Sequence, residues 1–194
     1  MPTPQLRRAL KTALEADPLE TRDGVPRPAP AQRPGGRRVV VLGVGSELRS
    51  DDAAGVRVCA ALARTLLSGV HTLDGGSAPE NCTAAIRHLA PSHLIIVDAA
   101  DLAQAPGTIR VIECADIGSA GFGTHALPLS VLADYLQKEV GCRVTVIGIQ
   151  PKSLEFGLTM SPEVSAAVAE TVHALRECLR EKSSLDAGRD VPVS

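Results

Sequence analysis

VVVLGVGSELRSDDAAG, residues 39–55, is a run of β-branched residues that leads through a glycine-containing turn to two adjacent aspartates. Apolar residues at helical spacing follow, so the stretch predicts a strand, a tight turn and a helix. The start of a helix favours anions, and a phosphate-binding turn leaves that position free of carboxylates. Because Asp51 and Asp52 stand there, the sequence favours a cation as the ligand.

Outward from this stretch, strand and helix patterns alternate along the chain. The expected strands are residues 39–42, 70–73, 94–97, 108–113 and 143–149, and the expected helices are residues 53–67, 80–89, 129–138 and the segment that begins at Pro162. The run at 94–97 is apolar throughout, which is typical of a parallel strand buried on both faces, whereas 108–113 alternates like a strand nearer an edge. Ser161 is a favourable cap for the last helix. This order predicts an α/β protein, a mostly parallel sheet with helices on both faces.

The composition limits the possible functions. The chain has 194 residues, enough for one domain, and only 2% aromatic residues, so the core must be aliphatic. A formal net charge of −2 gives no electrostatic basis for nucleic-acid binding. No apolar run approaches the roughly 20 residues of a membrane span, and the first residues lack a secretory signal. We therefore expect a cytoplasmic protein that neither inserts into membranes nor binds nucleic acid.

The cysteines argue against a disulfide framework or a zinc ribbon. There are five of them, an odd number, and no CxxC motif is present. Cys59 and Cys178 fall on apolar helical faces, where buried thiols are expected.

The first 37 residues differ from the rest. Leu6, Leu10 and Leu14 recur at helical spacing and predict a short amphipathic helix. The segment that follows is rich in Pro and Arg and is typical of a linker. We expect residues 1–37 to be a solvated, partly disordered extension, residues 38–182 to form the domain, and residues 183–194 to be a loose polar tail.

Candidate ligands follow the expected strands. In open α/β sheets, ligands bind beyond the carboxyl ends of the strands, which is where Asp52, Asp98 and the loop residue His125 fall. Each has an ordinary alternative: Asp52 could cap a helix, Asp98 could accept backbone hydrogen bonds, and His125 could have no special role. Together they predict a three-ligand site for zinc, nickel or another first-row divalent ion. Gly75 and Gly76 either let a substrate peptide approach the backbone or simply form a tight turn.

Other readings of these motifs are weaker. Gly43 and Gly45 resemble part of a dinucleotide fingerprint, but the third glycine is absent and the acidic pair would repel a pyrophosphate. There is no GxSxG motif, and no cysteine has the context of a catalytic nucleophile.

In its sequence motifs the chain resembles the [NiFe]-hydrogenase maturation endopeptidases. The resemblance rests on GVGSELRSDDAAG, DGGSAPEN, LIIVDAADL, PGTIRVIE, THALPLSVLADYL and VIGIQPKSLEFGLTMSPEV, which occur in the family's order and extend from residue 39 to about residue 179. DGGSAPEN together with GIQP is similar to the branch that processes hydrogenase 3-type large subunits. Ser46 and Ala53 depart from the family's usual Asn and Gly, and the N-terminal extension lies outside its pattern.

The resemblance implies a three-layer sandwich with a twisted five-stranded sheet. It also implies an endopeptidase that removes the C-terminal peptide of a hydrogenase large-subunit precursor after nickel insertion, with Asp52, Asp98 and His125 as the catalytic and metal-binding residues. We expect the nickel to be carried by the precursor, with zinc, cadmium or another divalent ion able to substitute. The alternatives are a non-catalytic nickel-binding accessory protein and a nucleotide-binding regulatory module.

Overall fold

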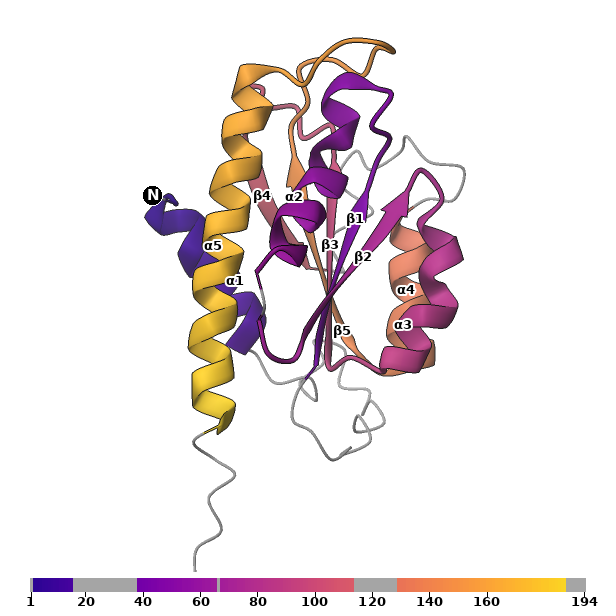
Figure 1. Ribbon diagram of the computed structural model, residues 1–194, viewed down its shortest axis with the longest axis vertical. Helices are drawn as coiled ribbons and strands as arrows, with labels where there is room; N and C mark the ends of the chain where they lie inside the picture. The colour runs from indigo at the N-terminus through magenta and orange to yellow at the C-terminus, as the bar shows by residue number, and fades with distance from the viewer. Residues whose placement is uncertain (1, 16–37, 66, 114–128, 188–194) are drawn as a thin grey trace, which may run out of the picture.

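A five-stranded sheet lies between two layers of helices (Figure 1). The computed structural model describes residues 2–15, 38–65, 67–113 and 129–187, with the backbone alone for Glu113 and residues 182–187. The strands are β1 (Val39–Val44), β2 (Val70–Gly76), β3 (His93–Ala99), β4 (Ile109–Glu113) and β5 (Arg143–Ile149). The helices are α1 (Pro4–Glu15), α2 (Ala54–Ala63), α3 (Thr83–Leu89), α4 (Leu129–Val140) and α5 (Pro162–Ala187), with the 3-10 turns η1 (Ser50–Ala53) and η2 (Pro79–Cys82). The predicted three-layer α/β architecture is confirmed.

The strand order, β2-β1-β3-β5-β4, creates a site at one edge of the sheet. Strands β1, β2, β3 and β5 are parallel, and β4 pairs antiparallel with β5 at the edge. The chain turns to one side of β1 to form β2 and to the other side to form β3. Such a reversal leaves a crevice at the carboxyl ends of the two diverging strands, here β1 and β3.

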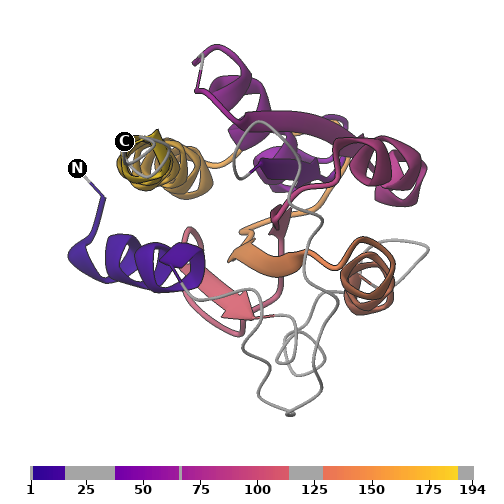
Figure 2. The same cartoon turned by 90° about the horizontal axis from the view of Figure 1, so that it is seen from below.

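The two faces of the sheet form separate apolar cores because successive strand residues point to opposite sides. Helices α1, α2 and α5 cover the face of Val41 and Ile95, and α3 and α4 cover the face of Val40 and Ile96 (Figure 2). Strands β1 and β3 are buried along their whole length. The fully apolar pattern of these two strands in the sequence has this physical cause.

Glycines let the start of α2 lie directly against the strand ends. A Cβ on Gly55 would stand 2.0 Å from the Val97 carbonyl oxygen and 2.4 Å from that of Val44. A Cβ on Gly43 would be 2.4 Å from the Gly55 carbonyl oxygen. These glycines thus allow a close contact between helix and sheet, which places the start of α2 at the carboxyl ends of β1 and β3.

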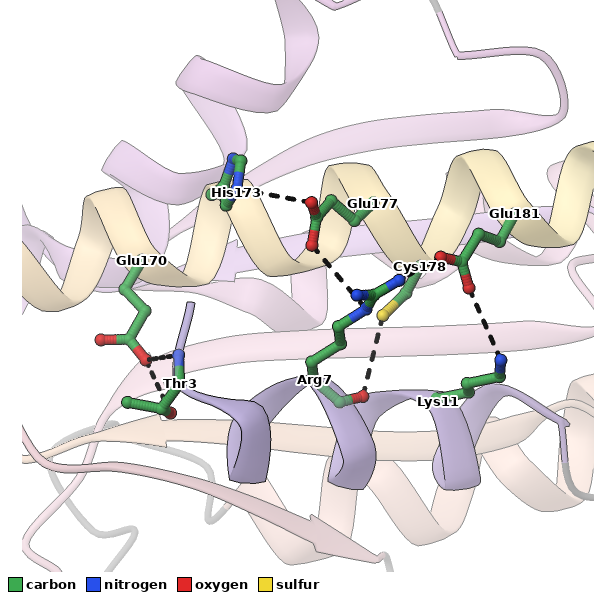
Figure 3. Close-up of polar contacts among 8 residues, drawn as sticks. All are labelled: Thr3, Arg7, Lys11, Glu170, His173, Glu177, Cys178 and Glu181. Atoms are coloured by element: carbon green, nitrogen blue, oxygen red, sulfur yellow. Dashed lines mark hydrogen bonds and ion pairs between the residues drawn. The ribbon is translucent and has the colours of Figure 1, made fainter. Parts of the chain in front are cut away.

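The N-terminal helix corrects one expectation. The predicted amphipathic helix is confirmed as α1, but it is not a solvated extension: Leu6, Leu10 and Leu14 are buried in the core shared with α5. Arg7 pairs with Glu177 and Glu181, and Glu170 accepts hydrogen bonds of 2.9 Å from both the N–H and the hydroxyl of Thr3 (Figure 3). Hence α1 belongs to the domain, although residues 16–37 lie outside the described part of the chain.

The C-terminal helix shows that a second expectation, a loose tail over residues 183–194, is wrong in part. Ser161 caps it as predicted, since its Oγ accepts the Val164 N–H at 3.4 Å. The helix, however, runs through Ala187, so the first part of the segment expected to be a loose tail is helical. No helix in the described ranges combines the length and apolarity needed to cross a membrane.

Gly55→Ala tests the close packing of α2. We expect a loss of about 3 kcal/mol in the free energy of unfolding, because the added methyl group would overlap the carbonyls of Val44 and Val97. Urea denaturation measures this loss. Gly157→Asn is the control, because a Cβ there meets nothing within 4 Å and Asn tolerates its φ of +74°. Equal stability of the two variants would contradict the packing role.

Candidate functional site

Asp52, in the turn η1 before α2, and Asp98, near the end of β3, lie at the carboxyl edge of the sheet. Asp98 is the sixth residue of β3 and is 1% exposed, and Asp52 lies in η1 and is 4% exposed. Gly55, three residues after Asp52, packs against Val97, the residue before Asp98. The glycine contact therefore brings the backbone next to Asp52 close to the backbone next to Asp98, although the two residues are 46 positions apart in the sequence.

One oxygen of Asp52 is used by the protein and the other is not. Oδ2 accepts the N–H of Ser46 at 2.8 Å, which closes the turn after β1. Oδ1 is buried and has no hydrogen-bond partner within the described residues. A buried carboxylate oxygen in this state is costly unless a cation or a donor reaches it. The alternative that Asp52 caps a helix is wrong, because neither η1 nor α2 has a side-chain cap hydrogen bond at its start.

The turn that holds Asp52 accommodates both departures from the family's pattern, Ser46 and Ala53. The hydroxyl of Ser46 accepts the N–H of Leu48 at 3.3 Å, a local bond of the kind that Asn also makes. Gly45 has a φ of +127°, and a Cβ there would stand 1.7 Å from the Asp52 carbonyl oxygen. Ala53 has a φ of −66°, which is ordinary for alanine. Neither departure from the family pattern disturbs the turn.

Asp51 has a role that sequence reasoning missed. It is 0% exposed, and its carboxylate accepts hydrogen bonds from the N–H groups of Lys152 (2.8 Å), Ser153 (3.1 Å) and Ser161 (2.6 Å) and from the Ser161 hydroxyl (3.0 Å). Burial alone would raise the pKa of Asp51, but these bonds outweigh it and hold the pKa below its ordinary value of 3.8. The first aspartate of the pair thus anchors the segment between β5 and α5, and the second is left for a ligand.

Gln150 orders the loop after β3. Its side-chain oxygen accepts the N–H of Leu102 at 2.6 Å and that of Gln104 at 3.3 Å, and its side-chain nitrogen donates to Asp101 Oδ1 at 3.4 Å. In the sequence, this role is indicated only by the position of Gln150, a polar residue directly after an apolar strand. The sequence shows no partner for it, because the partners lie 46 to 49 positions away.

The two glycines that end β2, Gly75 and Gly76, differ in their surroundings. Gly75 is buried, and a Cβ there would be 3.0 Å from the Gly43 carbonyl oxygen and from Leu42. Gly76 has a φ of +50° and open space around the position of a Cβ, and its carbonyl accepts the N–H of Gly45 at 2.9 Å. Asp74 Oδ1 closes the turn by accepting the N–H of Gly76 at 2.9 Å. The turn lies beside the Asp52 loop, and a role in substrate binding stays a prediction.

The remaining predicted groups can be placed only in part. His125 and Cys114 lie outside the described residues. Within the described ranges, no three His, Cys, Asp or Glu side chains are grouped so that they could hold a metal ion. Cys59 and Cys178 are buried as predicted, and burial raises the pKa of the Cys59 thiol to about 12, so it is not a nucleophile.

Asp51→Asn tests the anchor. Since the pKa of Asp51 is lower in the folded state, its ionised form stabilises the protein above pH 3.8, and this contribution is lost as the pH falls through the folded-state pKa. We expect the variant to lose about 2 kcal/mol near neutral pH, with the difference from the wild type shrinking below pH 3.8. Urea unfolding over a pH series measures both, and Glu155→Gln, an exposed position on the same segment, is the control. A difference between Asp51→Asn and the wild type that does not change with pH would contradict the anchor.

Comparison with known proteins gives the family. A family model described as hydrogenase maturation protease matches residues 56–177. The chain is 41% identical over 135 residues to the hydrogenase 3 maturation protease of Escherichia coli K12, covering 69% of this chain and 85% of that protein. It is 33% identical over 153 residues to the hydrogenase 2 maturation protease of the same organism, covering 74% and 92%.

A solved structure supports the same family. The crystal structure of a [NiFe] hydrogenase maturation protease HycI from Thermococcus kodakarensis KOD1 is similar with a TM-score of 0.69 and 27% identity, covering 76% of this chain and 95% of that one. The fold, the matched residues and the sequence identities lead to one conclusion: this chain belongs to the hydrogenase maturation protease family and is a peptidase.

Proposed function

We propose that this chain is the endopeptidase that removes the C-terminal peptide of a [NiFe]-hydrogenase large-subunit precursor once nickel has been inserted. Asp52, Asp98 and His125 recognise the nickel that the precursor carries. The observation that carries this proposal is the buried carboxylate of Asp52, with one oxygen tied to Ser46 and the other without a protein donor in the described residues.

The types of ligand at the proposed site suit an ion that is brought by the substrate and bound only temporarily. Two carboxylates and one imidazole can bind a first-row divalent ion, yet they are fewer and harder donors than a permanent high-affinity nickel site would use. A site of this kind leaves coordination positions for ligands from the substrate. Bound nickel would supply Lewis acidity to a peptide carbonyl. The protein's part is to hold Asp52 and Asp98 in place, which the Ser46 bond and the Gly55 packing accomplish.

Nickel recognition makes cleavage conditional. If the two carboxylates bind only a precursor that already contains nickel, the peptide is removed after metal loading and not before. We propose that the substrate peptide approaches the protein at Gly76, where the backbone is open, beside the Asp52 loop. Gly75, which lies close to Gly43 and Leu42, supports this turn. The large subunit of a hydrogenase 3-type enzyme is the proposed substrate, supported by the DGGSAPEN and GIQP motifs and by the 41% identity to the hydrogenase 3 protease.

Asp98→Asn tests the proposal. We expect the variant to fold normally and to process a nickel-loaded precursor more than about 100-fold more slowly, because even changes in the groups around metal ligands cost 10- to 100-fold. Mass spectrometry of the released C-terminal peptide measures the rate. Asp134→Asn is the control, because this exposed aspartate on α4 pairs only with Lys138 among the described residues.

Three results would contradict the proposal in whole or in part. Normal processing by Asp98→Asn would remove that residue from the site. Absence of any released peptide with the wild-type protein and the loaded precursor would favour the non-catalytic nickel-binding accessory protein instead. Equal cleavage of nickel-free and nickel-loaded precursor would leave the peptidase in place but remove nickel recognition.

A further inference from the structure

Three large apolar side chains are exposed beside the candidate site. Leu48 is 71% exposed, Phe156 69% and Leu158 52%. They lie on the turn after β1 and on the segment between β5 and α5. In the ranges that the structure describes, the other large apolar side chains with comparable exposure are Val131 and Tyr135, both on α4. Isolated exposed leucines are common, but three on two adjoining loops call for an explanation.

The two loops are bonded to each other. The N–H of Gly157 donates to the Leu48 carbonyl at 3.1 Å, and Arg49 Nε donates to the Leu154 carbonyl at 3.1 Å. The guanidinium carbon of Arg49 also lies 5.0 Å from the centroid of the Phe156 ring. These contacts hold Leu48 and Phe156 on one surface in the free protein, so little ordering is left for a binding event.

The same loops are bonded to the acidic pair. Asp52 accepts the N–H of Ser46, two residues before Leu48, and Asp51 accepts N–H groups on either side of Phe156, from Ser153 and Ser161. The apolar surface and the candidate ligand Asp52 are therefore parts of one hydrogen-bonded unit. A substrate that reached Asp52 would pass close to this surface.

We propose that Leu48, Phe156 and Leu158, here called the 48/156 surface, bind an apolar segment of the precursor that flanks the cleaved peptide bond. This inference rests on the proposed function and names the second contact of that substrate. The precursor is favoured over other occupants because the surface is continuous with the site at which its nickel is recognised. Binding removes the exposed leucines and the aromatic ring from water, which supplies the affinity that a weak ion site lacks.

The double variant Leu48→Ser/Phe156→Ser tests the surface. We expect KM for a nickel-loaded precursor to rise about tenfold with kcat within twofold of the wild type, because a few buried aromatic and aliphatic anchors dominate interfaces. The variant Leu48→Met/Phe156→Met keeps the surface apolar and should restore KM. Val131→Ser/Tyr135→Ser, at the comparably exposed positions on α4, is the control and should leave KM unchanged. Circular dichroism and thermal melting compare the folding of all variants.

Direct titration of the same precursor separates this inference from the proposed function. If the wild type binds the precursor and the serine variant binds it about tenfold more weakly, the surface is confirmed whether or not cleavage is observed. A serine variant indistinguishable from the α4 control would overturn the inference and leave the peptidase activity standing. A wild-type dimer that the serine variant dissociates, with KM unchanged, would assign the surface to a second copy of the chain and would also overturn it.

Discussion

The structure of this edge depends on hydrogen bonds to a buried acidic pair. Asp51 and Asp52 are neighbours in the sequence, yet their carboxylates have different hydrogen-bond partners. The Asp51 carboxylate accepts four hydrogen bonds, three from backbone N–H groups and one from a hydroxyl, and it ties the start of α2 to the segment that leads into α5. Asp52 accepts one bond from Ser46 and keeps its second oxygen without a donor in the described residues. A buried carboxylate satisfied by several donors stabilises a fold, and one left partly unsatisfied is costly unless a cation or a donor reaches it.

The close contact between helix and sheet makes this division possible. Gly43, Gly45 and Gly55 bring backbone carbonyls to distances that any side chain would prevent, so the acidic pair lies at the junction of β1 and β3. The exposed Leu48 and Phe156 are held by the same network. The proposed ion site and the proposed peptide-binding surface thus share one hydrogen-bonded support.

Much of the fold could be predicted from the sequence, because its elements are locally encoded. The strand at residues 143–149 was predicted to the residue, and the cap at Ser161 was read correctly from its position before Pro162. Features that depend on distant partners could not be predicted. Asp51 was indistinguishable from Asp52 because its donors lie 101 to 110 positions further along the chain. The docking of α1 also escaped prediction, since its leucines show an amphipathic helix but not the α5 surface that buries them. His125, outside the described residues, remains a prediction from the motif.

The central proposal is that Asp52, and not Asp51, binds the ion. The most direct measurement is an anomalous-difference map at the nickel absorption edge from crystals soaked in a nickel salt. We expect a peak within bonding distance of Asp52 Oδ1 and of the Asp98 carboxylate. A peak coordinated by Asp51, or no peak at this edge of the sheet while Asp52 Oδ1 accepts a hydrogen bond from a protein donor, would contradict it.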